Sequence, residues 1–364
     1  MSHVTGFIDI LNHIKESLTI DKKDLVVFAF NATGKTRLSY ELNTLSENEG
    51  EIETICYNSI VEDYFTWDNE SKTLAIDKSS WLFSIIEMEE LEKEITKNFS
   101  FFIDTKLEPN LDFGNGVIQF KKATGDDQAL EAIKISRGEE TLFKWAAFYS
   151  VLHRILEILN DKIDDRSTDM FNNLRYVVID DPISSLDDYR IYTLSSQLLR
   201  IIEFVHEKQL KIPFLISTHH VLFYNIIVNT MKNRKDKFVS YLLLRNKEDV
   251  ELQKLKNKEP ITYHLEMIKE ISKALKSNKL QKGHFNLFRS VLEKLAVFLG
   301  YDKWQDLFEN YSDKKKFEKL INMNSHERYA ELDTKYLTQE QINTFTDGFD
   351  YFKENYKFNI WVEK

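Results

Sequence analysis

The sequence has few of the residues that build covalent or metal-linked frameworks and few of those that interrupt helices. Its 364 residues include one cysteine, Cys56, ten glycines and four prolines. A single thiol excludes a disulfide framework and a multi-cysteine zinc site, and so few helix-breaking residues predict many helices with short linkers. No apolar run reaches 18 residues and the N-terminal segment lacks a signal-peptide core. We therefore expect a cytoplasmic protein.

An overall excess of basic charge is also absent. The net charge of −10 argues against a protein that binds nucleic acid over its whole surface. The charge is uneven, because residues 1–244 carry 27 basic and 39 acidic side chains, whereas residues 245–364 carry 22 and 20. Within the latter part, residues 252–300 hold ten Lys and Arg against four Asp and Glu. An acidic front and a locally basic back indicate two parts with different roles.

The first 245 residues alternate apolar runs with helical patterns. The stretches DLVVFAF, LRYVVIDDP and IPFLISTHH are typical of buried strands. Residues 139–160 place apolar side chains at i, i+3, i+4 and i+7, which predicts a long amphipathic helix. Beyond residue 262 the patterns are helical throughout. We expect an α/β domain over residues 1–248 and a mainly α-helical domain over residues 249–364.

The stretch VVFAFNATGKTRLSY, residues 26–40, is similar to a phosphate-binding loop. In the pattern G-x-x-x-x-G-K-[ST], Ala29 replaces the first glycine, while Gly34, Lys35 and Thr36 keep the other positions. A strand, a turn and a helix in this order direct backbone N–H groups at phosphate, and the first position needs only a tight turn, which alanine can make. Taken alone, an ordinary strand–turn–helix connection explains the stretch equally well.

Three further motifs follow along the chain. RYVVIDDPISSLDD ends a strand with Asp180 and Asp181, where one acid can hold Mg²⁺ and a second can polarise water. ISRGEE places Ser136 and Gly138 at the start of the long helix, and FLISTHH ends a strand before His219. Each motif alone also has a structural explanation, as an acidic strand end, a helix N-cap or a structural histidine.

Together and in this order, the motifs resemble the ABC-type ATPase family, in the compact branch that includes chromosome-maintenance and repair ATPases. The resemblance implies ATP or GTP with Mg²⁺, and a head-to-tail homodimer in which the signature of one subunit closes over the nucleotide of the other. It implies nucleotide contacts from Asn31, Thr33, Gly34, Lys35, Thr36, Arg37, Ser136, Gly138, Glu139 and Asp187. It also implies Mg²⁺ on Thr36 and Asp180, a catalytic base at Asp181, where Asp replaces the commoner Glu, and γ-phosphate sensing by His219.

The C-terminal part carries a second candidate site. In HFNLFRSVLEKLAVFLGY, Arg289 and Glu293 lie four residues apart on one helix face, and INMNSHERY places His326 in a polar stretch. Such residues can cut RNA without a metal, because the ribose 2′-OH needs a base, the leaving 5′-oxygen an acid and the phosphate a cation. Glu293 and His326 can each fill the acid or the base role. A surface ion pair and a loop histidine also explain these residues without catalysis.

Over nearly its whole length, the sequence is similar to the PrrC anticodon nuclease family. The similarity runs from FAFNATGKTRLSY through VVIDDPISSLDD and STHHVLFYN to YHLEMIK, LFRSVLEKLAVFLGYDKW and INMNSH. It implies an ABC-type P-loop NTPase domain followed by a mainly α-helical (HEPN-like) nuclease domain, with Arg289, Glu293 and His326 as the RNase triad. It further implies a toxin that cuts a tRNA, usually tRNA-Lys, in its anticodon loop, and that a type I restriction–modification enzyme silences until phage infection.

Substrate choice is where the sequence departs from the family. The segment before Tyr263 and His264, where recognition is expected, reads LQKLKNKEPIT and is unusually basic. Its lysines, Lys254, Lys256 and Lys258, suit phosphate contact or a solvated surface equally. Two other functions fit parts of the sequence: a nucleotide-gated ABC-type regulator with no nuclease activity, and a DNA-repair ATPase. The lack of a Cys-x-x-Cys hook, the short interval between the loop and the signature and the acidic N-terminal part disfavour the repair ATPase.

Overall fold

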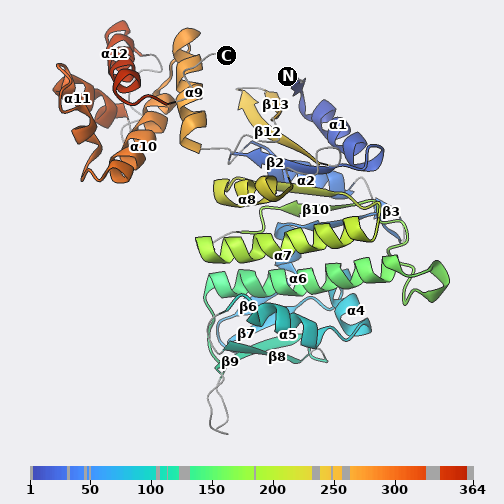
Figure 1. Cartoon of the computed structure of the whole chain (residues 1–364). Coiled ribbons are helices and arrows are strands. Elements are labelled where there is room, and N and C mark those ends of the chain that lie inside the picture. The colour runs from blue at the N-terminus through green and yellow to red at the C-terminus, as the bar shows by residue number, and fades with distance from the viewer. Residues whose placement is uncertain are drawn as a thin grey trace. The chain divides into compact units, whose positions relative to one another are not determined.

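The chain folds into two units, Met1–Pro260 and Ile261–Lys364. The computed structural model (Figure 1) describes residues 3–30, 33–44, 47–48, 51–103, 107–112, 114–122, 132–183, 186–231, 238–246, 249–255, 263–324 and 337–358. None of the helices in these ranges is long and apolar enough to cross a membrane. The two units are described separately.

The first unit is built on a seven-stranded sheet with the strand order β1-β13-β12-β2-β11-β10-β5. The strands are β1 (His3–Thr5), β2 (Asp24–Ala29), β5 (Thr54–Tyr57), β10 (Tyr176–Asp180), β11 (Phe214–Thr218), β12 (Phe238–Asn246) and β13 (Asp249–Lys254). From β12 to β5 all pairs are parallel, and every residue of β2, β10 and β11 is buried. Parallel strands are covered on both faces, which is why these stretches are continuously apolar. The predicted α/β fold is confirmed.

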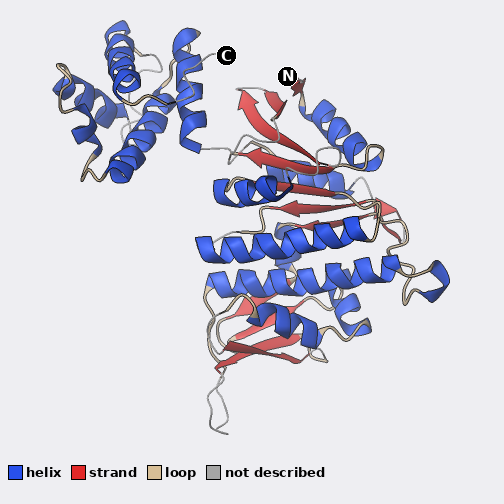
Figure 2. Cartoon of the chain, viewed as in Figure 1, coloured by secondary structure: helices blue, strands red, loops and turns tan. Residues whose placement is uncertain are grey.

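Helices cover both faces of this sheet (Figure 2). The main ones are α1 (Phe7–Thr19), α2 (Lys35–Thr44), α6 (Arg137–Asn160), α7 (Asp188–Glu207) and α8 (Val221–Met231). Leu25, Val27 and Ala29 of β2 share one core cluster with α1 and α2. Phe28 points to the opposite face and meets Tyr224 of α8, with ring centroids 5.5 Å apart. The period of two along β2 therefore assigns α1 and α2 to one face and α8 to the other.

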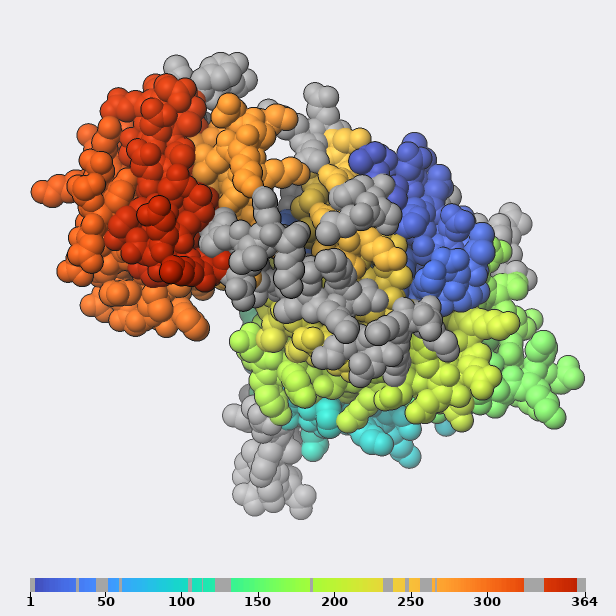
Figure 3. Space-filling model, turned by 45° about the horizontal axis from the view of Figure 1, so that its top comes forward, coloured from blue at the N-terminus to red at the C-terminus, as the bar shows by residue number. Residues whose placement is uncertain are grey.

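Helix α1 lies at the surface of the first unit (Figure 3). Its residues Ile10, Ile14 and Leu18 recur every four positions and are all 1% exposed or less, so one apolar stripe fixes the helix to the sheet. The helix predicted over residues 139–160 is confirmed by α6, which begins two residues earlier at Arg137 and ends at Asn160.

A smaller antiparallel sheet, which the sequence analysis did not predict, packs beside α6. Its order is β6-β7-β9-β8, with β6 (Phe65–Asp68), β7 (Thr73–Ile76), β8 (Leu107–Asp112) and β9 (Val117–Lys122). The first unit also contains shorter elements: a two-stranded sheet of β3 (Glu47–Asn48) and β4 (Glu51–Ile52), with α3 (Ser59–Asp63), α4 (Trp81–Met88), α5 (Glu92–Ser100) and η1 (Ile163–Asp165). Phe143 of α6 joins Phe120 of β9 and Phe99 of α5, at centroid distances of 5.2 and 5.3 Å. Edge-to-face aromatic contacts thus attach this sheet to the long helix.

The second unit is helical in the residues that the structure describes, as predicted. It contains α9 (Tyr263–Lys276), α10 (Lys282–Leu299), η2 (Trp304–Phe308), α11 (Lys314–Asn324) and α12 (Gln339–Asn355). Phe288 of α10 lies at its centre and contacts the rings of Phe317, Phe345, Phe349 and Phe352, at centroid distances of 5.0–6.1 Å. This aromatic core gives the unit a hydrophobic interior of its own.

The boundary between the units lies later than the expected position after residue 248. Residues 249–254 form β13, which pairs with both β12 and β1 and so completes the sheet of the first unit. Lys254, assigned from the sequence to the second domain, is the last residue of this strand, while Lys256 and Lys258 lie outside the described residues. The alternation of Val250 and Leu252 with polar neighbours was the available signal. Leu252 is fully buried.

Candidate functional site

The carboxyl ends of three neighbouring strands bring one set of predicted residues together. In the sheet, β11 lies between β2 and β10, and all three run parallel. The loop before Lys35 therefore opens at the same edge as Asp180, Asp181 and His219. Ligands of open parallel sheets bind at this edge, where helix N-termini also converge.

The phosphate loop begins one residue later than its pattern suggested. Ala29, expected in a tight turn, is the last residue of β2, pairs with Leu243 and is fully buried. Beyond the end of the strand, the Thr33 hydroxyl donates to the Phe30 carbonyl at 2.7 Å. Gly34 has a φ of +100°, which favours glycine, although the space around it is open. Asn31 lies outside the described residues.

Lys35, Asp181 and His219 form one hydrogen-bonded cluster. Lys35 is 8% exposed, and its Nζ donates to Asp181 Oδ2. His219 Nδ1 contacts the same oxygen and lies 3.4 Å from Lys35 Nζ. An ionised carboxylate oxygen can only accept hydrogen bonds, so the contact with Asp181 requires that His219 Nδ1 carries the hydrogen. Burial alone would raise the pKa of Asp181, but the hydrogen bonds from His219 and Lys35 outweigh it and lower the pKa to about 2. Asp181 is thus an ionised acceptor.

Asp180 has a different environment. It ends β10, is 7% exposed and accepts hydrogen bonds from Ser217 Oγ and, at 3.0 Å, from Ser39 Oγ. Burial raises the pKa of Asp180, and the Asp181 charge raises it further. The hydrogen bonds from Ser217 and Ser39 and the Lys35 charge lower it, but burial outweighs them. A cation bound beside Asp180 would favour its ionised form and offset the cost of burying that charge. Ser39 was missed from the sequence, although it lies one helical turn after Thr36. Its single hydroxyl hydrogen is shared between Asp180 and the Thr36 carbonyl, each 3.0 Å from Oγ.

The other residues that were predicted to contact nucleotide make local contacts within the single chain. Arg37 packs its guanidinium 4.1 Å from the Phe7 ring centroid. Ser136 and Glu139 form a capping box at the start of α6, with Glu139 N donating to Ser136 Oγ at 3.3 Å and Ser136 N to Glu139 Oε2 at 2.7 Å. Gly138 is buried in the first turn of α6. Asp187 caps α7 by accepting from Arg190 N at 2.9 Å. A role across a dimer stays a prediction for this group.

In the second unit, the predicted pair of α10 is in contact. Arg289 Nε donates to Glu293 Oε1 at 2.8 Å, with side-chain exposures of 26% and 51%. A second nitrogen of Arg289 lies 3.3 Å from Asn322 Oδ1 on α11. The structure adds Asn322 to the candidate site, because the two helices pack side by side. His326 lies outside the described residues, two positions beyond the end of α11 at Asn324.

His264 lies in the first turn of α9 and is partly buried. Burial lowers the pKa of His264, and the nearby Lys294 ammonium lowers it further. Both effects favour the neutral imidazole, which can accept or donate a hydrogen bond.

The low pKa of Asp181 makes a prediction about stability. Its ordinary value is 3.8 and its folded value about 2, so the ionised carboxylate stabilises the fold above about pH 4 and this contribution is lost as the pH falls through about 2. The difference corresponds to about 2 kcal/mol. Asp181→Asn should lower the free energy of unfolding by about that amount at pH 6, measured with denaturant, and by progressively less towards pH 2. A constant difference between the two proteins at every pH would contradict the assignment.

Comparisons with known proteins give the family. A protein family described as an AAA domain matches residues 111–350. An anticodon nuclease of Escherichia coli is 32% identical over 361 residues, which covers 92% of this chain and 89% of that protein. Among solved structures, the SMC head domain from Thermotoga maritima aligns with a TM-score of 0.32 and 11% identity, over 65% of this chain and 91% of its own. An ABC-transporter ATP-binding cassette in its ADP conformation aligns with a TM-score of 0.25 and 10% identity, over 62% and 77%.

The relative spans both units, and the sheet edge with Lys35 and the Arg289–Glu293 pair lie within the aligned length. At this identity and coverage, the chain belongs to the anticodon nuclease family and is an enzyme that carries an AAA-type NTPase domain, with a mainly helical unit after its α/β unit.

Proposed function

We propose that this enzyme is an NTP-regulated toxin endoribonuclease that cuts a tRNA in its anticodon loop. In this proposal the ribose 2′-OH attacks the neighbouring phosphate, and no metal acts at the scissile bond. The observation that carries the proposal is the Arg289–Glu293 contact on α10, at 2.8 Å, in a chain of the anticodon nuclease family. The relevant domains are the first unit, ending near residue 260, for nucleotide, and the helical second unit for RNA.

The geometry around Arg289 suits an RNA phosphate. Its guanidinium has partners on two helices, Glu293 on α10 and Asn322 on α11, so its orientation is set before a ligand arrives. A planar guanidinium can donate two parallel hydrogen bonds to phosphate oxygens. Glu293 is half exposed and can take the 2′-OH proton or, if His326 is the base, protonate the leaving 5′-oxygen.

A single-stranded loop is the substrate that such a site can reach. Side chains cannot enter the deep, narrow major groove of an RNA duplex, whereas the unstacked nucleotides of a loop can be splayed into a pocket. Similarity to the family supports tRNA-Lys as the target, a type I restriction–modification complex as the silencing partner, antiphage defence as the role and the cytoplasm, where tRNA is found, as the location.

The first unit would regulate this activity through nucleotide. Lys35, Gly34 and the backbone around Asn31 and Thr33 would hold the phosphates of ATP or GTP, and Thr36 and Asp180 would hold Mg²⁺. These hydroxyl and carboxylate oxygens suit Mg²⁺, which usually binds one or two carboxylates together with nucleotide phosphates. When bound, Mg²⁺ neutralises phosphate charge. Asp181 would orient the attacking water.

A homodimer would complete the nucleotide site in this proposal. Ser136, Gly138 and Glu139 at the N-terminus of α6, with Asp187 before α7, would approach the nucleotide of a second subunit. The N-terminus of a long helix favours an anion, which supports this role.

The experiment that tests the proposed function maps the ends of cut tRNA. We expect a 2′,3′-cyclic phosphate on one fragment and a 5′-hydroxyl on the other, because the 2′-OH is the nucleophile. A tRNA with 2′-deoxyribose at the cut site should bind yet resist cleavage. A chelator should block activation by nucleotide, but should leave cleavage by already activated enzyme intact. Cleavage of the deoxy substrate or 5′-phosphate ends would overturn the mechanism, and no tRNA cleavage at all would favour a nucleotide-gated regulator.

A further inference from the structure

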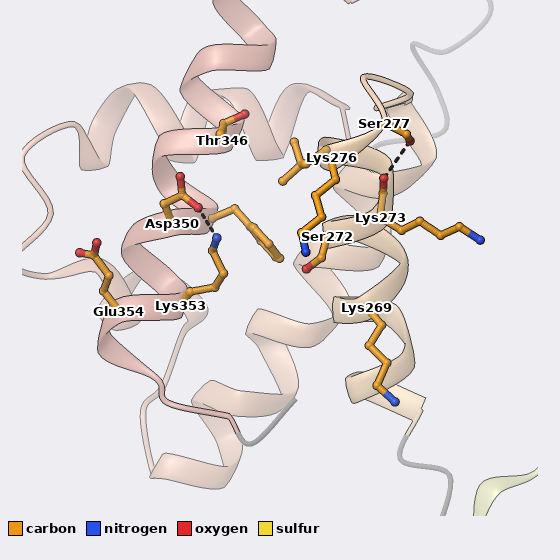
Figure 4. A pocket seen from close by; sticks show the side chains of 11 residues that line it. Lys269, Ser272, Lys273, Lys276, Ser277, Thr346, Asp350, Lys353 and Glu354 are labelled. Atoms are coloured by element: carbon orange, nitrogen blue, oxygen red, sulfur yellow. Dashed lines mark hydrogen bonds and ion pairs between the residues drawn. The ribbon is translucent and has the colours of Figure 1, made fainter. Parts of the chain in front are cut away.

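A groove of about 1000 Å³ lies within the second unit, between α9 and α12 (Figure 4). Four lysines line it: Lys269, Lys273 and Lys276 from α9, and Lys353 from α12. Two acids, Asp350 and Glu354, also line it, so the basic groups outnumber the acidic ones. None of the roles proposed above uses this groove.

The three lysines of α9 form one stripe. Positions 269, 273 and 276 are spaced i, i+4 and i+7, which places them on one helix face at intervals of about 5–6 Å. The stripe is about 10 Å long at 1.5 Å per residue. Lys276 reaches into the space between the helices, whereas the ends of the Lys269 and Lys273 side chains extend from α9 away from α12 (Figure 4). A row of regularly spaced cations is complementary to a linear polyanion.

Lys353 provides the facing cation. It forms an ion pair with Asp350, and its Nζ lies 5.5 Å from the centroid of the buried Phe349 ring. These contacts hold the ammonium on the wall opposite the stripe. Ser272, Ser277 and Thr346 also line the groove, but each hydroxyl donates to a carbonyl of its own helix, so the lysines are the groups that would bind phosphate.

A purely structural explanation accounts for only part of this pattern. Lys273 and Lys276 lie in the last turn of α9, where cations stabilise the negative end of the helix dipole. Lys269 lies a turn earlier, and Lys353 belongs to another helix. The dipole therefore does not explain why four lysines border the same groove.

We infer that this groove, named here the lysine groove, binds the phosphodiester backbone of the RNA substrate away from the scissile bond. The inference rests on the proposed tRNA cleavage, and RNA is favoured because the Arg289–Glu293 pair lies in the same unit. Lysine is a flexible point charge that binds phosphate without reading bases. The lysine groove would thus provide affinity and hold the tRNA, while the choice of the cut nucleotide lies elsewhere.

The test replaces Lys269, Lys273 and Lys276 together by Gln in the full chain, which removes three charges but keeps a good helix former. A matched control replaces Lys303, Lys315 and Lys319, which lie in the same unit but do not line the groove. Binding of intact tRNA is measured in a His326→Ala background as a function of salt, and cleavage is measured with His326 present. Melting temperatures of both triple variants check the fold.

Loss of three phosphate contacts should raise the dissociation constant about 50-fold at 0.15 M salt and reduce the slope of log K against log salt by about 2. The KM for tRNA should rise accordingly, kcat at saturation should stay unchanged, and the control variant should behave as wild type.

If wild-type enzyme cuts tRNA but both triple variants keep its KM and salt slope, the lysine groove is not an RNA site, although the proposed function stands. Equal weakening by both variants would indicate diffuse charge and would also overturn the inference. Polyglutamate tests an acidic protein as the ligand. If both variants bind tRNA equally but only the groove variant loses polyglutamate binding, the groove binds an acidic protein and the inference is wrong. Failure of wild type to cut tRNA would instead refute the proposed function.

Discussion

Replacing Arg289, Glu293 or His326 by Ala should lower the rate of tRNA cleavage by about 10²–10⁴-fold in each case, because proton transfer and phosphate stabilisation each contribute on this scale. NTP hydrolysis should persist, since its candidate residues belong to the other unit. The measurement is cleavage of a labelled tRNA beside phosphate release in the same preparation. Because the three groups would act in one step, double variants should be scarcely worse than single ones.

The structure offers a matched control for the Arg289–Glu293 pair. Lys314 and Glu318 form another i,i+4 ion pair in the same unit, on α11, with N···O at 3.9 Å. Partly exposed pairs of this kind contribute well under 1 kcal/mol to folding, so replacing either pair by Ala should change the melting temperature little. Of these two double variants, only the one that lacks Arg289 and Glu293 should lose cleavage on the scale given above. If the α11 double variant loses cleavage equally, or if hydrolysis collapses together with cleavage, the triad assignment is wrong.

Lys35→Ala should weaken nucleotide binding by about 100-fold or more, equivalent to about 3 kcal/mol. Lys35 is a buried cation at the sheet edge where phosphates are expected, and the Asp181 carboxylate is its present partner. Removal of the ammonium leaves that carboxylate facing the nucleotide, which adds repulsion to the lost attraction. Titration with a fluorescent nucleotide measures the affinity, and RNA cleavage that depends on nucleotide should be lost with it.

Asp181→Asn is the control for this variant, because it breaks the same ion pair from the other side. It should bind nucleotide at least as tightly as wild type, since the carboxylate that competes for Lys35 is gone, but it should hydrolyse the nucleotide much more slowly. Equal loss of binding in both variants would mean that the ion pair shapes the binding site and that Lys35 makes no separate contact with phosphate. Unchanged affinity in Lys35→Ala would identify the loop as a structural turn.

The order of the motifs along the sequence was enough to predict much of this protein. Buried parallel strands are continuously apolar, so β2, β10 and β11 were recognisable, as were the long helix α6 and the helical second unit. The resemblance to ABC-type ATPases implied one nucleotide site for Lys35, Asp181 and His219, and the parallel pairing of the three strands brings these residues to one edge. Helical spacing alone predicted the contact of Arg289 with Glu293, four residues apart.

Only the tertiary structure decided features that depend on partners distant in the sequence. Asp181 accepts a hydrogen bond from Lys35, which lies 146 residues earlier in the sequence, and Asn322 accepts one from Arg289, 33 residues earlier. The boundary between the units lies late because β13 pairs with β1, which comes from the start of the chain. Ala29 belongs to a strand because it pairs with β12. Local pattern specifies which element a segment forms and which of its faces is apolar. Strand neighbours, and the hydrogen bonds between polar side chains that burial forces together, are set by packing of the whole chain.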